Sequence, residues 1–147
     1  MTPGLFNNIG TSVLAISFTA QEFGAPIPIA KALLATPLVT HKTLLNYLAR
    51  KNAAVLSIEQ LIVSRTECFA NFNSRYYAGL CDSVNAIQFL VDVELAELKD
   101  NALWVSNLQY DSTMGKRAQK IWKAASRIAV LLQAPASQLY SSLRIRL

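Results

Sequence analysis

The sequence is poor in the side chains that enzymes use for acid–base chemistry and metal binding. Its 147 residues include one histidine, His41, and two cysteines, Cys68 and Cys81, without a C-x-x-C spacing. Catalysis and zinc binding both need several such groups close together. The five glycines are scattered and form no phosphate-binding loop. We therefore expect no enzyme activity and no catalytic, cofactor-binding or metal-binding residues, and we interpret both cysteines as buried thiols.

Charged residues are also scarce, at 16% of the chain against roughly 25% in an average soluble domain. Hydrophobic residues make up 52%, which excludes a disordered chain and suggests a surface partly covered by partners. The best candidate for a membrane span, Ile9 to Ala20, is shorter than the roughly 20 apolar residues that a span needs. No Lys or Arg precedes Lys31, as a secretory signal would require. We therefore expect a cytoplasmic protein.

The charges that are present separate along the chain. The formal net charge is +5, yet the stretch from Asp82 to Asp111 holds six acidic residues against the single Lys99. The stretch from Ser112 to Leu147 holds seven basic residues and no acidic one. Such a separation indicates either two different contact surfaces or two solvated faces of one domain.

The first third of the chain predicts an amphipathic helix and a proline-rich connector. Apolar residues recur at steps of three or four from Phe6 to Phe23, which is the period of one helical face. Gly24 ends this helix. Pro26 and Pro28 forbid a continuous helix through the next residues, so a short extended connector is expected.

The apolar run from Ala32 to Val39 follows this connector. Pro37 restricts the residue before it, which predicts a kink or a break inside the run. Thr40 or Thr43 is then expected to cap a helix that continues to about Arg50.

The middle of the chain predicts two helices and a β-hairpin. Ser57 and Gln60 form a capping-box pattern at the start of a long helix from Ile58 to about Tyr76. A second helix is expected from Asp82 to about Val93. Two short alternating runs within Leu95 to Ser106, joined by turn-forming residues, are typical of a hairpin.

The last third holds the most regular helical pattern, from Lys116 to Gln133, and Pro135 ends it. Together these elements predict one mainly α domain of the α+β class, with a winged-helix-like helix–helix–hairpin unit and a C-terminal helix. Within the single domain 1–147 we distinguish an N-terminal helical part (1–56), the winged-helix-like part (57–110) and the C-terminal helix and tail (111–147).

A winged helix that reads DNA presents basic or amide side chains from its second helix. Here Asn85 and Gln88 are the only such residues, and they lie near Asp82, Asp92 and Glu94. A helix this acidic repels phosphate. We therefore favour a winged helix used for protein contact, with a DNA-binding transcriptional regulator as the alternative because of the net positive charge.

The proline-flanked apolar segment is a candidate partner-binding site, because a rigid connector loses little entropy on binding. Histidine and lysine at a helix start can also meet an anion, although a capping or surface histidine is the more ordinary interpretation. The partner-binding candidates are Pro26, Pro28, Pro37, His41 and Lys42.

A basic stripe follows one face of the C-terminal helix at steps of four, three and four residues. It is explained equally well by solvation, by DNA phosphates or by an acidic partner. Its members are Lys116, Lys120, Lys123 and Arg127.

Four stretches resemble the middle components of bacterial three-component ABC systems, which include the small subunit of Lamassu-type anti-phage defence. They are Asn7 to Gly24, Pro26 to Leu48, the AIQFLVDVELAELKDNALWVS stretch and the tail ASRIAVLLQAPASQLYSSLRIRL. Pro37-Leu38 followed by His41-Lys42 is similar to the family's Leu-Pro-Leu and His-Lys pattern.

The resemblance implies a non-catalytic subunit that binds an SMC/Rad50-like ABC ATPase and an effector, often a nuclease. Such a subunit helps to hold the effector inactive until foreign DNA is sensed. From the residues themselves we expect no cofactor and no membrane contact, and the basic stripe allows sequence-independent DNA contact through the complex.

Overall fold

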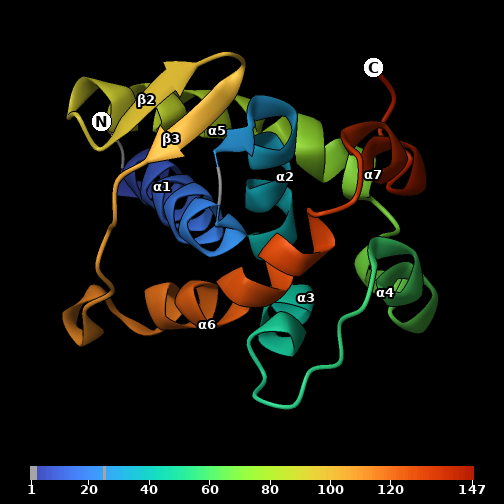
Figure 1. Cartoon of the computed structure of the whole chain (residues 1–147). Helices are drawn as coiled ribbons and strands as arrows, with labels where there is room; N and C mark the ends of the chain where they lie inside the picture. The colour runs from blue at the N-terminus through green and yellow to red at the C-terminus, as the bar shows by residue number, and fades with distance from the viewer. Residues whose placement is uncertain (1–2, 25) are drawn as a thin grey trace.

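The computed structural model describes residues 3–24 and 26–147, with side chains from Ile9 onward, so the predicted apolar side chain of Phe6 lies outside the described residues. Within these residues the fold is mainly helical with one small antiparallel sheet, which confirms the α+β class (Figure 1). The helices and strands, in chain order, are α1 Pro3–Phe23, β1 Ile27–Pro28, α2 Ile29–Val39, α3 Lys42–Leu48, α4 Ile58–Ser64, α5 Phe72–Asp92, β2 Ala96–Lys99, β3 Ala102–Val105, α6 Lys116–Leu131 and α7 Ala136–Ser142.

Helix α1 lies at the centre of the fold, in contact with α2, α5, α6 and β3 (Figure 1). Ala15, Ile16 and Phe18 are buried within this arrangement. Gly24 ends the helix with a φ of +78°, a conformation that favours glycine. Because neighbours surround α1 on most sides, its apolar run forms the core of the domain.

No helix in the described part of the chain is both long and apolar enough to cross a membrane.

Helix α2 continues through Pro37, so the predicted break is wrong. A proline there removes one backbone donor near the end of the helix. The Arg75 side chain, from α5, donates to the Pro37 carbonyl at 3.4 Å. The predicted caps are wrong, because Thr40 lies at the C-terminal end of α2 and His41 caps the next helix. That helix itself is confirmed as α3, which ends at Leu48, close to the predicted Arg50.

The predicted long helix from Ile58 to Tyr76 is wrong, although its cap is confirmed. Ser57 Oγ accepts from the Gln60 amide at 3.1 Å, but α4 ends at Ser64. The Thr66 hydroxyl donates to the Ile62 carbonyl at 2.9 Å just beyond that end, and a 3₁₀ turn follows at Thr66–Cys68.

Helix α5 then runs without interruption from Phe72 to Asp92, so Asp82 lies inside a helix instead of starting one. Gly79 lies within α5 where a side chain would crowd α2, since an added Cβ would be 3.3 Å from the Thr36 methyl group. Helices α1 and α2 contact α5, whereas α4 contacts the 3₁₀ turn and α7. The helices that pack against α5, the helix before the hairpin, are therefore α1 and α2 from the first third of the chain, rather than α4 from the predicted winged-helix-like part.

The predicted hairpin is confirmed as β2 and β3. Asp100 and Asn101 connect the strands with φ angles of 55° and 60°, as a tight primed turn requires. Strand β1 pairs with the other side of β3, so the sheet order is β1-β3-β2. Ile27 lies opposite Leu103 in this pairing, and both side chains are buried, which joins the hairpin to the core.

The C-terminal helix is confirmed as α6. Ile121, Ala125 and Ile128 are buried against the rest of the domain, as their spacing predicts. Trp122 of the same helix is about half exposed and stacks on Tyr110 at 4.6 Å between ring centroids.

Candidate functional site

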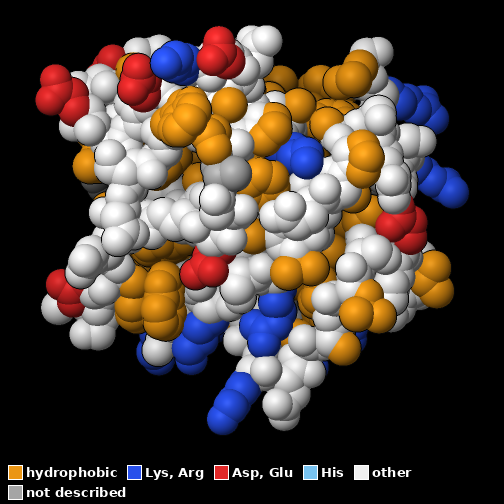
Figure 2. Space-filling model, viewed as in Figure 1, with side chains coloured by type: hydrophobic (Ala, Val, Ile, Leu, Met, Phe, Trp, Pro, Cys, Tyr) orange, Lys and Arg blue, Asp and Glu red, His pale blue; other side chains and the backbone are white. Residues whose placement is uncertain are grey.

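Acidic and basic side chains gather at separate ends of the molecule. Figure 2 shows the acidic group at the upper left, over the hairpin, and basic side chains along the bottom, over α3 and α6. We call the hairpin region the acidic hairpin end; its exposed carboxylates are Asp92, Glu94, Glu97 and Asp100. The hairpin carboxylates and the cations over α3 and α6 therefore form two distinct surfaces, whereas Asp82 of the acidic stretch lies in a cavity with Arg117, and Arg144 and Arg146 of the basic stretch line another.

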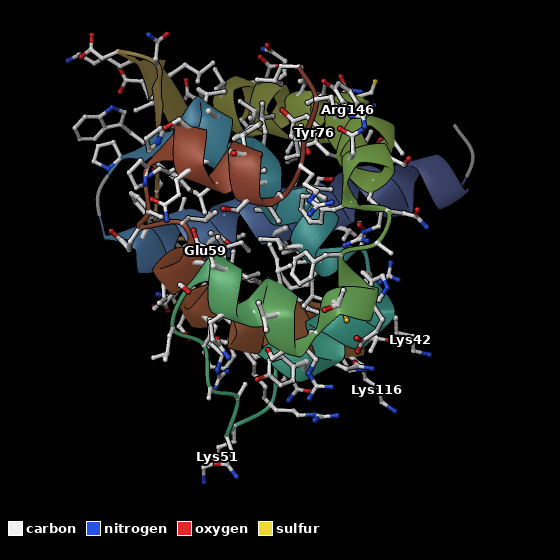
Figure 3. All side chains as sticks on the ribbon, turned by 90° about the vertical axis from the view of Figure 1, so that its right-hand side faces the viewer. Lys42, Lys51, Glu59, Tyr76, Lys116 and Arg146 are labelled. Carbon is white, nitrogen blue, oxygen red and sulfur yellow. The ribbon has the colours of Figure 1, made fainter. Side chains whose placement is uncertain are left out.

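The basic end contains a small groove between α3 and α6. Its cavity of about 220 Å³ is lined by three cations and four neighbouring residues, and we call it the basic groove. The lining residues are Val39, Thr40, Lys42, Leu45, Asn46, Arg117 and Lys120. Figure 3 shows Lys42 and Lys116 projecting toward the same side of the molecule. Three cations around one hollow suit a phosphate or carboxylate group.

The basic groove joins two candidate sites that the sequence kept apart. Lys42 came from the proline-flanked segment and Lys120 from the basic stripe, and they now line one cavity. Arg117 also lines it, and sequence reasoning missed this residue because the four-three-four spacing of the stripe passes over it. Its position three residues before Lys120, on the same side of a helix, was the available signal.

A second, polar cavity adjoins the basic groove and shares Thr40 and Arg117 with it. Its volume is about 160 Å³, and its lining includes Ser12, Thr36 and Asp82. The hydroxyls of Ser12 and Thr36 are buried here without a hydrogen-bond partner. Buried hydroxyls without partners destabilise a fold, so this cavity is suited to ordered water.

His41 has a structural role at the start of α3. Its Nδ1 accepts a hydrogen bond from the Leu44 amide at 3.2 Å, which requires an unprotonated Nδ1. Burial and the nearby charge of Arg75 lower the pKa of His41, and Glu67 opposes them. The capping interpretation of this histidine is therefore confirmed.

The three candidate prolines lie on different parts of the fold. Pro37 is buried within α2, whereas Pro26 and Pro28 are half-buried before the helix, with Pro28 opposite Ala102 of β3. Residues 29–39 form a helix, so only Pro26 and Pro28 belong to an extended connector. The buried apolar side chains of that helix, Ala32, Leu34, Ala35, Pro37, Leu38 and Val39, belong to the core.

Arg127 differs from the other members of the basic stripe. Its guanidinium donates to the carbonyls of Leu48 and Lys51 at 2.9 Å each and to that of Ala53 at 3.4 Å. These bonds hold the loop after α3 against α6. Lys116 and Lys123 are exposed, so the stripe contains both a structural cation and solvent-facing ones.

The acidic hairpin end also exposes large apolar side chains, which sequence reasoning missed. Leu98 and Trp104 are each 49% exposed, and Phe89 and Val93 of the adjoining helix end are similarly exposed. A cavity of about 570 Å³ lies beside them, lined by Val91, Glu94, Ala96, Glu97, Leu98, Trp104, Val105 and Ser106. Leu98 and Trp104 lie on opposite faces of the hairpin, since Leu98 pairs with Leu103 and Glu97 with Trp104, so alternation alone gave no signal for their exposure.

The two cysteines have different surroundings. Cys68 is buried, and this burial raises the pKa of its thiol. Cys81 is exposed on α5, so the interpretation of both as buried thiols is wrong for this residue. Among the residues that the structure describes, no group of histidines, cysteines and carboxylates is arranged to hold a metal ion.

Comparison with known families finds a match over most of the chain. The family described as ABC-three component (ABC-3C) system Middle Component 3 matches residues 10–147, which is nearly the whole chain. No curated protein and no solved structure matches the chain.

Proposed function

Because the chain belongs to the Middle Component 3 family of ABC-three component systems, we propose that it is a non-catalytic accessory subunit bridging an SMC/Rad50-like ABC ATPase and an effector. The resemblance to middle components is confirmed at the level of the family, which implies protein partners. The proposal adds that the effector is a nuclease, that the system is a Lamassu-type anti-phage defence, and that this subunit helps to restrain the effector until foreign DNA is sensed.

The separation of charge between the acidic hairpin end and the basic groove carries this proposal. Surfaces of opposite sign attract different partners and repel the wrong one, which fixes the orientation of each partner. A subunit that joins two other proteins needs two such surfaces. The exposed apolar residues of the hairpin end provide apolar surface that can be buried against a partner, which charged side chains alone do not provide.

The alternative, a winged-helix transcriptional regulator, requires α5 and the hairpin to approach DNA phosphates. That surface carries Asp92, Glu94, Glu97 and Asp100. Four carboxylates repel the phosphate backbone, which supplies most of the affinity in DNA binding. The assembly role is therefore favoured over DNA reading by the hairpin.

Matched charge reversals test the bridging role in the complex co-expressed with its ATPase and effector. The groove variant Lys42→Glu/Lys120→Glu is compared with Lys51→Glu/Lys123→Glu, which makes the same charge change outside the groove. The hairpin variant is Glu94→Lys/Glu97→Lys. We expect the groove and hairpin variants each to lose one partner and keep the other, while the control keeps both.

Recovery of both partners by the groove and hairpin variants would contradict the bridging role. Loss of both partners by one correctly folded variant would instead indicate one shared surface. Circular dichroism of each variant checks its folding before the pull-down.

The basic groove has two possible targets, DNA phosphates and an acidic surface of a partner. A salt titration of DNA binding by the assembled complex separates them, because phosphate contacts give an affinity that falls steeply with salt and is indifferent to sequence. Loss of DNA affinity with intact assembly in the groove variant indicates DNA and contradicts the groove as a surface that holds a protein partner. Loss of assembly without DNA indicates an acidic partner.

A further inference from the structure

Strand β2 forms an open edge of the sheet. The sheet order β1-β3-β2 leaves one side of β2 without a neighbouring strand in the described residues. The Ser106 amide donates to the Leu95 carbonyl at 2.7 Å, which places this pair at a hydrogen-bonded position. Because such positions alternate along an antiparallel pair, Glu97 and Lys99 also bond to β3. The backbone donors and acceptors of Ala96 and Leu98 therefore point outward.

Proteins usually protect such an edge with a short strand, charged side chains, proline, a bulge or a covering loop, and β2 has the first two, with four residues that include Glu97 and Lys99. The sequence of β2 is Ala-Glu-Leu-Lys, without proline, and its four residues pair with β3 in unbroken register. Lys99 is the one basic residue of the strand and lies beside the turn. The edge is thus regular and able to pair with another strand.

The two faces of β2 differ in chemistry. Ala96 and Leu98 share one face with the buried Leu103, while Glu97 and Lys99 share the other with Trp104. The cavity of about 570 Å³ lies against this strand and the end of α5. A strand added at the edge would continue both faces, because side chains alternate along it.

We propose that the β2 edge binds an extended segment of a partner subunit in which apolar residues alternate with Lys or Arg. The apolar residues of this segment pack beside Leu98, and its basic residues face the carboxylates around Glu97. Backbone hydrogen bonds to Ala96 and Leu98 provide the docking, as in other cases of strand addition. The identity of the partner rests on the proposed function.

The charge around the edge selects a basic segment. Residues 92–100, which include the strand, carry the exposed Asp92, Glu94, Glu97 and Asp100, against Lys99 alone. An acidic segment would meet four like charges, and a neutral one would gain no attraction. Binding is therefore expected to weaken as the salt concentration rises.

Hydrogen exchange of the wild-type chain, alone and in the co-expressed complex, is the first test. The amides of Ala96 and Leu98 are expected to exchange rapidly in the free chain and to be protected in the complex. Those of Glu97 and Lys99, already bonded to β3, serve as the internal reference. Unchanged exchange of Ala96 and Leu98 in an intact complex would overturn the proposal.

Substitutions at Leu98 provide the second test. Leu98→Pro removes the outward donor without removing a bond to β3, and Leu98→Ala is the control for the lost side chain. We expect the proline variant to bind its partner about three- to tenfold more weakly than the alanine variant, as for the loss of one hydrogen bond. Equal affinities would contradict strand addition.

The two proposals fail in different ways. If the wild-type chain recovers no ATPase or effector, the assembly role itself fails. If it assembles but Leu98→Pro and Leu98→Ala bind alike and the edge amides stay unprotected, only the docking mode fails. Circular dichroism of the variants excludes a trivial loss of folding, and the exchange experiment needs no variant.

Discussion

The acidic hairpin end and the basic groove are built in different ways. The hairpin end consists of two strands joined by a two-residue turn, so its charged residues are close in sequence. The basic groove places Lys42 beside Arg117 and Lys120, which come from distant parts of the chain. A local turn is sufficient for the first surface, whereas the second exists only when α3 and α6 pack together.

The largest effect is expected from the residue that anchors the hairpin end to the core. Leu103→Ala removes a side chain that is 1% exposed and is expected to lower the free energy of unfolding by about 3 kcal/mol. Leu98→Ala, opposite it on the half-exposed strand, should cost about 1 kcal/mol or less. Urea denaturation measures both, and equal losses would show that the hairpin is not anchored through Leu103.

A smaller effect is expected at the basic end, where Arg127 bonds the loop after α3. Arg127→Ala should lower the free energy of unfolding by about 1 to 2 kcal/mol, because three carbonyls lose a charged donor. The exposed Lys123, one turn away, provides the control, and Lys123→Ala should change stability by less than about 0.5 kcal/mol. If the two variants are equally stable, Arg127 contributes no more to stability than the exposed Lys123 does. Thermal denaturation at matched pH makes the comparison.

The cap of α3 should add a pH dependence to the basic end. His41→Ala is expected to cost about 1 kcal/mol at pH 7. The pKa of His41 is lowered in the folded state, so the unfolded chain binds more protons near the ordinary value of 6.5. The free energy of unfolding should therefore fall as the pH drops from 7 toward 5.

The variant His41→Asn tests this dependence because asparagine caps a helix without titrating in this range. Its urea midpoint should fall less between pH 7 and pH 5 than that of the wild type. An identical fall in both proteins would assign the dependence to other groups.

The smallest effect on stability, with a visible effect on association, is expected from Leu98→Thr. The chain purified alone should self-associate through its exposed apolar side chains, which Leu98 and Trp104 supply at the hairpin end. Leu98→Thr keeps a strand-forming residue and should change stability by less than about 0.5 kcal/mol while reducing association. Leu56→Thr, at an exposed position outside the hairpin, is the control. Sedimentation at several concentrations measures the difference.

Local patterns predicted the elements whose signals lie within a few residues. The hairpin turn at Asp100 and Asn101, the Ser57 cap and helix α6 were all predicted from neighbouring residues. Helix α5 was not, because its apolar pattern continues on both sides of Asp82 and no local residue marks its true start at Phe72. Pro37 was misleading for the opposite reason, since packing in the core holds α2 together through a residue that usually interrupts helices.

The candidate site was predicted only in part. The charge clusters and the residues Lys42 and Lys120 were visible in the sequence, but their meeting in one groove was not. In the sequence Arg127 cannot be distinguished from the lysines of the basic stripe. Only the structure shows that its guanidinium donates to carbonyls more than 70 positions earlier. The exposure of Leu98 and Trp104 was likewise hidden, because alternation in a strand does not say which face is buried.

The sequence by itself determined the helical periods, the hairpin turn, the family and the unequal distribution of charge, because each depends on residue types and short spacings. Only the tertiary structure decided which cations line the basic groove, which arginine is used to hold a loop, and which strand edge of the sheet remains open. These properties depend on contacts between distant segments, where burial and hydrogen-bond partners give chemically similar residues different roles.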